Sequence, residues 1–129
     1  MADFIRLEVS ATPAAMPVVR MVLGGVAARV DLSLDEIDDL YVAVEQLLSA
    51  ANDSGEEPRH ELSIEVVDDG VSVSAGPFRS SSLRARLAGD DATGFDLKTV
   101  MRGVVESIEV CAAPDDCYCV VFAKRRAGA

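Results

Sequence analysis

Aromatic residues are scarce in this chain of 129 residues: they make up 5% of it, and tryptophan is absent. The core must therefore be built mainly from aliphatic side chains. Apolar residues of all kinds make up 50% of the sequence, which favours a folded domain over a disordered chain. A chain of this length can bury one sizeable core, so we expect a single domain over residues 1–129.

The sequence also lacks any apolar run near the roughly 20 residues of a membrane-spanning helix, and it lacks a secretory signal pattern. Its three cysteines, Cys111, Cys117 and Cys119, are an odd number, and the single histidine, His60, lies far from them. A disulfide framework or a metal site is therefore not expected. We interpret the cysteines as buried free thiols, with Cys117 and Cys119 on one face of a strand. These features predict a cytoplasmic protein with no membrane partner.

Positive charge is in short supply, because 12 lysines and arginines stand against 22 aspartates and glutamates and the net charge is −10. This balance argues against nucleic acid as a partner, since phosphate contacts need clustered lysine and arginine. Between Asp31 and Asp69 the only full positive charge is Arg59. Such a distribution is typical of a surface that steers a protein of complementary charge; a solvated acidic face that maintains solubility is the alternative.

The clearest predicted element is a helix within DLSLDEIDDLYVAVEQLLSAAND, residues 31–53. Ser33 and Glu36 form a capping-box pattern at its start. The acids from Asp35 to Asp39 lie where the helix dipole favours negative charge, or form a contact surface. Apolar side chains recur at helical spacing and form one stripe: Leu34, Ile37, Leu40, Tyr41, Val44, Leu47, Leu48 and Ala51.

Other elements precede this helix and follow it. FIRLEVS, residues 4–10, is predicted as a strand, and a helix follows with Thr12 as its cap and Pro13 in its first turn. Strands over 61–67 and 71–76 flank an Asp-Gly turn. A short helix ended by Gly89 and a helix over 95–105 come next, and the strands SIEVCAA and CYCVVFAKR complete the chain.

This order of elements predicts an α+β two-layer sandwich, with a mixed or mostly antiparallel sheet and helices on one face. The helix with VVR, the segment LSLDEIDDLYVAVEQLLSAAND, the hairpin and the segment TGFDLKTVMRGVVESIEV together resemble the bacterial anti-sigma factor serine/threonine kinases. The resemblance covers roughly residues 4–124. It implies the histidine kinase-like ATPase fold and three motifs that hold Mg-ATP.

The first family motif is an acid on the second helix, followed at spacings of four by an asparagine and a histidine. The acid serves as the phosphotransfer base, and the asparagine binds Mg²⁺. Glu45 holds the acid position, Ser49 the asparagine position and Asp53 the histidine position. The spacing places Glu45 and Ser49 on one helix face. Glu45 is thus the candidate catalytic residue and Ser49 a substituted metal ligand; alternatively, Glu45 is a solvated side chain at the edge of the stripe.

The second family motif is Asp-x-Gly at the end of a strand, where the carboxylate binds the adenine amino group. Asp68-Asp69-Gly70 matches this sequence pattern, but it lies where a hairpin turn is needed. Ser74-Ala75-Gly76 is the better match, with Ser74 in place of the aspartate and Gly76 retained. A serine offers adenine only a neutral contact.

The third family motif is a glycine-rich segment before the last helix, where backbone N–H groups hold phosphate. Gly94 is retained, but Asp96 replaces the second glycine. This change adds a side chain and a negative charge where phosphate would approach.

The three substitutions predict that tight Mg-ATP binding is lost, so no cofactor is expected. ATP and Mg²⁺ would be cofactors only if the site is functional. We predict a non-catalytic regulator, a degenerate kinase, that binds a sigma factor or an anti-anti-sigma protein and forms a homodimer, as the resemblance implies. Arg20 matches the arginine that the family uses for partner contacts; alternatively, it pairs with a local acid. The other candidates are an active ATP-dependent kinase with Glu45 as base, and a domain that binds another ligand in the vacated cleft.

Overall fold

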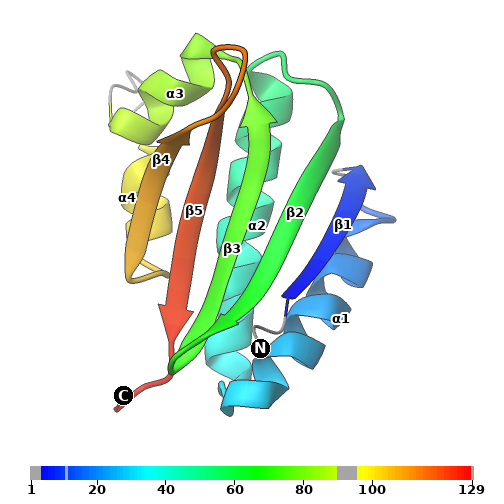
Figure 1. Ribbon diagram of the computed structural model, residues 1–129, viewed down its shortest axis with the longest axis vertical. Helices are drawn as coiled ribbons and strands as arrows, with labels where there is room; N and C mark the ends of the chain where they lie inside the picture. The colour runs from blue at the N-terminus through cyan, green and yellow to red at the C-terminus, as the bar shows by residue number, and fades with distance from the viewer. Residues whose placement is uncertain (1–3, 11, 90–95, 129) are drawn as a thin grey trace.

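The computed structural model describes residues 4–10, 12–89 and 96–128. These residues form two layers, a five-stranded sheet and a layer of helices that covers one of its faces (Figure 1). The strands are β1 (Phe4–Ser10), β2 (Arg59–Val67), β3 (Gly70–Phe78), β4 (Ser107–Ala112) and β5 (Tyr118–Arg125). They lie in the order β1-β2-β3-β5-β4, and every neighbouring pair is antiparallel. The predicted α+β sandwich is confirmed, and it is compatible with a histidine kinase-like ATPase fold.

The helices follow the predicted order. They are α1 (Met16–Ala27) with the 3-10 turn η1 (Ala28–Val30), α2 (Leu34–Asp53), α3 (Ser81–Ala88) and α4 (Leu97–Arg102). In Figure 1, α2 lies behind the middle of the sheet, with α1 on one side of it and α3 and α4 on the other. No helix in the described part of the chain is long and apolar enough to span a bilayer.

The predicted start of the first helix is wrong. Thr12 accepts a hydrogen bond from the backbone N–H of Ala15 within a separate turn, and the helix begins at Met16. Pro17, rather than Pro13, occupies the first helical turn, where a missing N–H costs little. Leu34 is also a correction, because it lies at the first helical position and is 73% exposed instead of joining the buried stripe.

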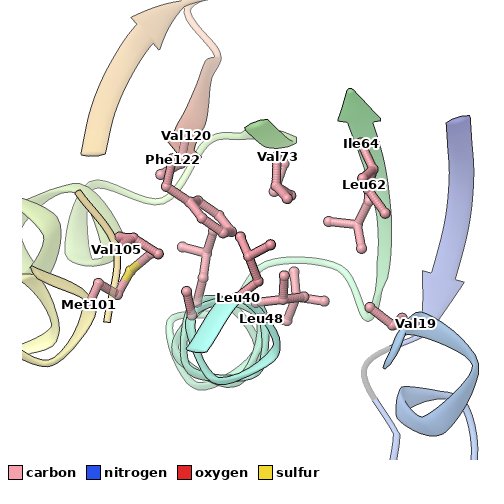
Figure 2. Packing of buried hydrophobic residues seen from close by; sticks show 14 of the residues in the cluster. Val19, Leu40, Leu48, Leu62, Ile64, Val73, Met101, Val105, Val120 and Phe122 are labelled. Carbon is pink, nitrogen blue, oxygen red and sulfur yellow. The ribbon is translucent and has the colours of Figure 1, made fainter. Parts of the chain in front are cut away.

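The core lies between α2 and the sheet. Figure 2 shows Leu40 and Leu48 of α2 directed toward Leu62, Val73 and Phe122 of the sheet, and each of these five side chains is at most 1% exposed. Alternation along a strand sends every second side chain to the helices. The burial of the helical stripe and of one sheet face explains why this sequence folds into two layers.

The other face of the sheet is not covered by helices. In β3, Val71, Val73 and Ala75 are buried, whereas the alternate residues Ser72 and Ser74 are partly exposed. Ser72 and Ser74 therefore point to the open face. Ser74, which the sequence predicts as an adenine-site residue, therefore points away from the helical layer.

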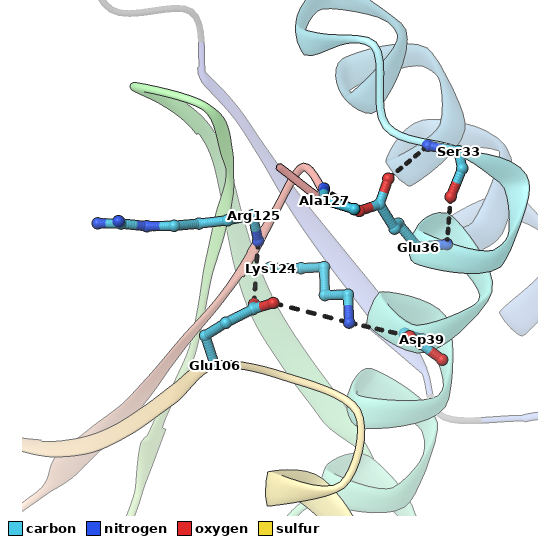
Figure 3. A network of polar contacts seen from close by, with 7 residues as sticks. All are labelled: Ser33, Glu36, Asp39, Glu106, Lys124, Arg125 and Ala127. Atoms are coloured by element: carbon cyan, nitrogen blue, oxygen red, sulfur yellow. Dashed lines mark hydrogen bonds and ion pairs between the residues drawn. The ribbon is translucent and has the colours of Figure 1, made fainter. Parts of the chain in front are cut away.

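Polar contacts tie the start of α2 to the chain's last residues (Figure 3). The Ser33 hydroxyl accepts from the N–H of Glu36, and the Glu36 carboxylate accepts from the N–H of Ser33, so the predicted capping box is present. The same carboxylate accepts a hydrogen bond from Ala127. The Nζ of Lys124 makes an ion pair with the Oδ2 of Asp39 on α2 at 2.9 Å. The cap of α2 is thus also an anchor for the segment after β5.

Candidate functional site

Glu45 and Ser49 lie on the flank of α2 that faces α1. Both line a groove of about 560 Å³ between α2 and the start of α1, together with Met16, Pro17 and Tyr41. Both side chains are exposed. The structure therefore brings the first two predicted site residues together, as their spacing required, in a groove lined by both polar and apolar side chains.

Charged groups continue along this flank. Arg20 of α1 makes an ion pair with Asp38 of α2 through Nη2 and Oδ1. Burial raises the pKa of Tyr41, and the neighbouring Glu45 carboxylate raises it further. Arg20 therefore has a local acidic partner, which was the alternative interpretation of this residue, and it remains 41% exposed and accessible to another protein.

Ser74 does not join this group. It lies in the middle of β3, opposite Ser63 of β2 and Val121 of β5, on the open face of the sheet. The sheet itself separates it from Glu45 and Ser49, which lie in the helical layer. The Ser74 and Glu45 side chains therefore lie on opposite sides of the sheet.

Asp96 caps α4 instead of lining a groove with Glu45. Its Oδ1 accepts from the N–H of Lys98 at 3.0 Å, and its Oδ2 accepts from the hydroxyl of Thr99 at 3.2 Å. Gly94 lies outside the described residues. Since α4 packs on α2 on the side away from α1, the structure places Asp96 apart from the groove.

Gly76 also has a role that its motif position did not predict. It lies near the end of β3 with a positive φ of 139°, a conformation that suits glycine. A Cβ at this position would lie 3.1 Å from the Sγ of Cys119 and 3.0 Å from the carbonyl oxygen of Tyr118. The absence of a side chain here makes room for β5.

Aromatic side chains fill the space below the end of β3. Phe78 is 1% exposed and Tyr118 is 2% exposed, with ring centroids 5.9 Å apart. His60 packs on Phe78 at the same centroid distance, and its Nε2 donates to Oδ1 of Asn52 at 2.9 Å. This cluster closes the core at the C-terminal end of α2.

Burial changes the proton affinities in this cluster. It lowers the pKa of His60, although the charge of Glu56 opposes that effect. It raises the pKa of Tyr118 to about 12, and the Tyr118 hydroxyl donates to the carbonyl oxygen of Ser80 at 2.6 Å. Both residues are therefore held in their uncharged forms at neutral pH, as burial among apolar side chains favours.

Sequence reasoning missed a one-residue ambiguity in α2. Each residue turns the helix by roughly 100°, so Ala50 points in a different direction from Ser49, whereas Gln46 lines the same groove as Glu45. Ala50 is 3% exposed, on the flank away from the α1 groove. If the family motif is shifted one residue toward the C-terminus, Gln46 takes the position of the acid and Ala50 takes the position of the asparagine.

Comparison with known proteins gives a partial match to a bacterial kinase. No family model matches the chain. A segment of 50 residues is 40% identical to the serine-protein kinase RsbW of Bacillus subtilis (strain 168). The match covers 39% of this chain and 31% of that protein, so it spans about a third of the relative's length. The chain is therefore similar over part of its length to a serine-protein kinase, which supports the family resemblance in part.

Proposed function

We propose that the chain is a cytoplasmic regulator that resembles an anti-sigma factor, acts by binding another protein, and has largely lost its nucleotide site. The observation that carries this proposal is the dispersal of the motif positions. Glu45 and Ser49 face α1, Ser74 lies on the open face, and Asp96 caps α4. A phosphotransfer enzyme needs its base, metal ligand and phosphate donors around one nucleotide.

The cap of α4 supports the loss of phosphate binding. Helix N-termini hold phosphate through free N–H groups. Here the Asp96 carboxylate already accepts the N–H of Lys98, and its negative charge would repel an anion at this point. A phosphate would have to displace a bound carboxylate.

The residues of α2 support the same proposal under either reading of the motif. Glu45 can act as a base, but Ser49 is a short and neutral ligand for Mg²⁺. Gln46 cannot accept a proton as a carboxylate does, and Ala50 has no ligand atom. Neither Glu45 with Ser49 nor Gln46 with Ala50 therefore supplies both a base and a strong Mg²⁺ ligand.

The surface of α1 is the proposed contact region for a sigma factor or an anti-anti-sigma protein. The side chain of Arg20, near the middle of α1, is 41% exposed and pairs with Asp38 on α2, and Glu45 lies about two helical turns further along α2. A partner that carries both charges in complementary positions would pair with Arg20 and with these acids.

A homodimer is proposed on the adjoining apolar surface. Met21 is 75% exposed, Val18 53%, Phe4 56% and Ile5 44%. Phe4 and Ile5 belong to β1, which is an edge strand with one unpaired side. Exposed apolar groups beside an unpaired strand favour association with another chain.

The test of the main proposal is a pair of measurements on the full chain. Isothermal calorimetry with Mg-ATP and Mg-ADP should give no heat of binding in the micromolar range. Surface plasmon resonance against purified sigma factors and anti-anti-sigma proteins should give saturable binding that Arg20→Ala weakens and Arg102→Ala does not. Micromolar nucleotide binding would contradict the loss of the site, and equal effects of the two substitutions would contradict the contact region.

An active kinase is the second candidate, and the match to a serine-protein kinase favours it. Transfer of labelled phosphate from Mg-ATP to a serine of an anti-anti-sigma protein would establish this activity. If Glu45 is the base, Glu45→Gln should abolish the transfer, whereas Glu57→Gln, a substitution in the loop after α2, should preserve it. No transfer above the level of a denatured control would count against this candidate.

A further inference from the structure

The cysteines occupy different environments from those predicted. Cys111 is exposed on β4, Cys119 is partly exposed on β5, and Cys117 is buried in the turn between these strands. The prediction that all three are buried is therefore wrong for Cys111. Cys117 lies outside β5, so it does not share a strand face with Cys119.

Cys111 and Cys119 lie directly opposite each other in the antiparallel pair of β4 and β5. Directly opposite residues point to the same face of a sheet, with Cα atoms about 4.5 or 5.5 Å apart. Disulfides usually join Cα atoms about 4.4 to 6.8 Å apart. The spacing of the two Cα atoms in this register therefore suits a disulfide.

Both thiols lie on the open face of the sheet. Tyr118 and Val120, on either side of Cys119, point into the core, so Cys119 points away from the helices. Gly76 of β3 lies beside Cys119 and has no side chain to cover its sulfur. The pair is reachable from solvent through Cys111.

We propose that Cys111 and Cys119 are a modification site, at which hydrogen peroxide converts the two thiols into a reversible disulfide. The thiolate of Cys111 attacks one peroxide oxygen; an S–O bond forms, the O–O bond breaks, and hydroxide leaves and takes up a proton as water. The sulfur of Cys119 then attacks the sulfenic sulfur of Cys111 and loses its proton. An S–S bond forms, the S–O bond breaks, and a second water leaves. The two sulfurs lose two electrons in total, and peroxide gains them.

The environments of the thiols set the order of these steps. Burial raises the pKa of Cys119, and its neighbour Cys111 raises it further, so Cys119 remains a thiol at neutral pH. Cys111 is the more exposed sulfur and meets peroxide first. Cys117 is enclosed by the turn, with its Sγ 3.7 Å from the carbonyl oxygen of Asp115, and is expected to stay reduced.

The test counts and maps thiols on the full chain. After peroxide treatment and unfolding in a thiol-blocking reagent, the three free thiols should fall to one, and dithiothreitol should restore all three. Proteolytic cleavage before Asp115 separates Cys111 from Cys117 and Cys119. Fragment mass spectrometry should then find two peptides joined through Cys111 and Cys119, with a blocked Cys117.

Matched variants complete the test. Cys117→Ser should still lose both remaining thiols, whereas Cys111→Ser and Cys119→Ser should form no intramolecular disulfide. The mapping on the unaltered chain decides the question even if a variant does not fold. Three persistent thiols at a peroxide dose that oxidises a control dithiol, a bond that involves Cys117, or a bond between two chains would each overturn the proposal.

Discussion

The carboxylate of Glu36 accepts a hydrogen bond of 2.6 Å from the backbone N–H of Ala127, 91 positions later in the chain. The same side chain completes the cap of α2 by accepting the N–H of Ser33 at 2.8 Å. One residue at the start of the longest helix therefore holds both that helix and the segment that follows the last strand.

Replacement of Glu36 is expected to reduce stability at both places. Glu36→Ala removes the acceptor for two N–H groups and should lower the free energy of unfolding by about 1 to 3 kcal/mol. Asp35→Ala, on the exposed neighbouring position, should cost less than about 0.5 kcal/mol. Urea unfolding followed by circular dichroism measures the difference, and equal losses for both variants would contradict the role of Glu36.

Glu36 also predicts a loss of stability in acid. The hydrogen bond from the N–H of Ser33 is the main cause that lowers the pKa of this carboxyl below its ordinary value of 4.5. A lowered pKa of an acid means that the folded chain binds the proton less readily than the unfolded chain. This contribution is present above pH 4.5 and is lost as the pH falls below it. The Glu36→Ala variant should therefore show a weaker decline in stability than the unaltered chain over that range.

His60 predicts a second pH effect in a separate range. Burial lowers its pKa below 6.5, so the folded chain holds the neutral ring while the unfolded chain takes up a proton. Stability should decline as the pH falls below 6.5. The chain has one histidine, so a single imidazole signal in the NMR titration reports it. A midpoint at or above 6.5 would show that the ring is not held as described.

Two phenylalanines that differ strongly in burial offer a matched comparison. Phe78 is 1% exposed between His60 and Tyr118, and Phe4 is 56% exposed on β1. Phe78→Ala should cost about 3 to 5 kcal/mol through the cavity that it leaves, whereas Phe4→Ala should cost less than about 1 kcal/mol. Chemical unfolding of the two variants tests whether Phe78 is an integral part of the core.

Met21 tests the proposed homodimer. Met21→Glu places a charge in the apolar surface of α1 and should shift the chain toward the monomer in sedimentation equilibrium. Leu34→Glu is the matched control, because Leu34 is 73% exposed and Met21 75% exposed, and Leu34 lies outside that surface. If neither or both variants change the molecular mass, this surface does not mediate the dimer.

Much of the fold followed from local sequence signals. The capping box at Ser33 and Glu36 predicted the start of α2, and the Asp69-Gly70 pair predicted the position of the turn between β2 and β3, because both depend on contacts within a few residues. The start of α1 was predicted too early, since two prolines near Thr12 give two plausible first turns.

The candidate site was less predictable. The spacing of Glu45 and Ser49 correctly placed them on one face of α2, but it could not state which helix that face would meet. Ser74 was predicted as a site residue because Ser74-Ala75-Gly76 matches the Asp-x-Gly motif in position. Its side chain lies on the uncovered face of the sheet. A shift of one residue reverses the face of a strand, so a motif comparison without coordinates cannot fix the direction of a side chain.

The sequence by itself determined the order of the elements, the cap of α2 and the aliphatic core, because helical and strand periodicities and capping patterns act over short distances along the chain. Only the tertiary structure decided that Glu45 faces α1, that Phe78 fills the core beside His60, and that Cys111 lies opposite Cys119. These relationships depend on packing and on strand register, which bring together residues that no local pattern connects.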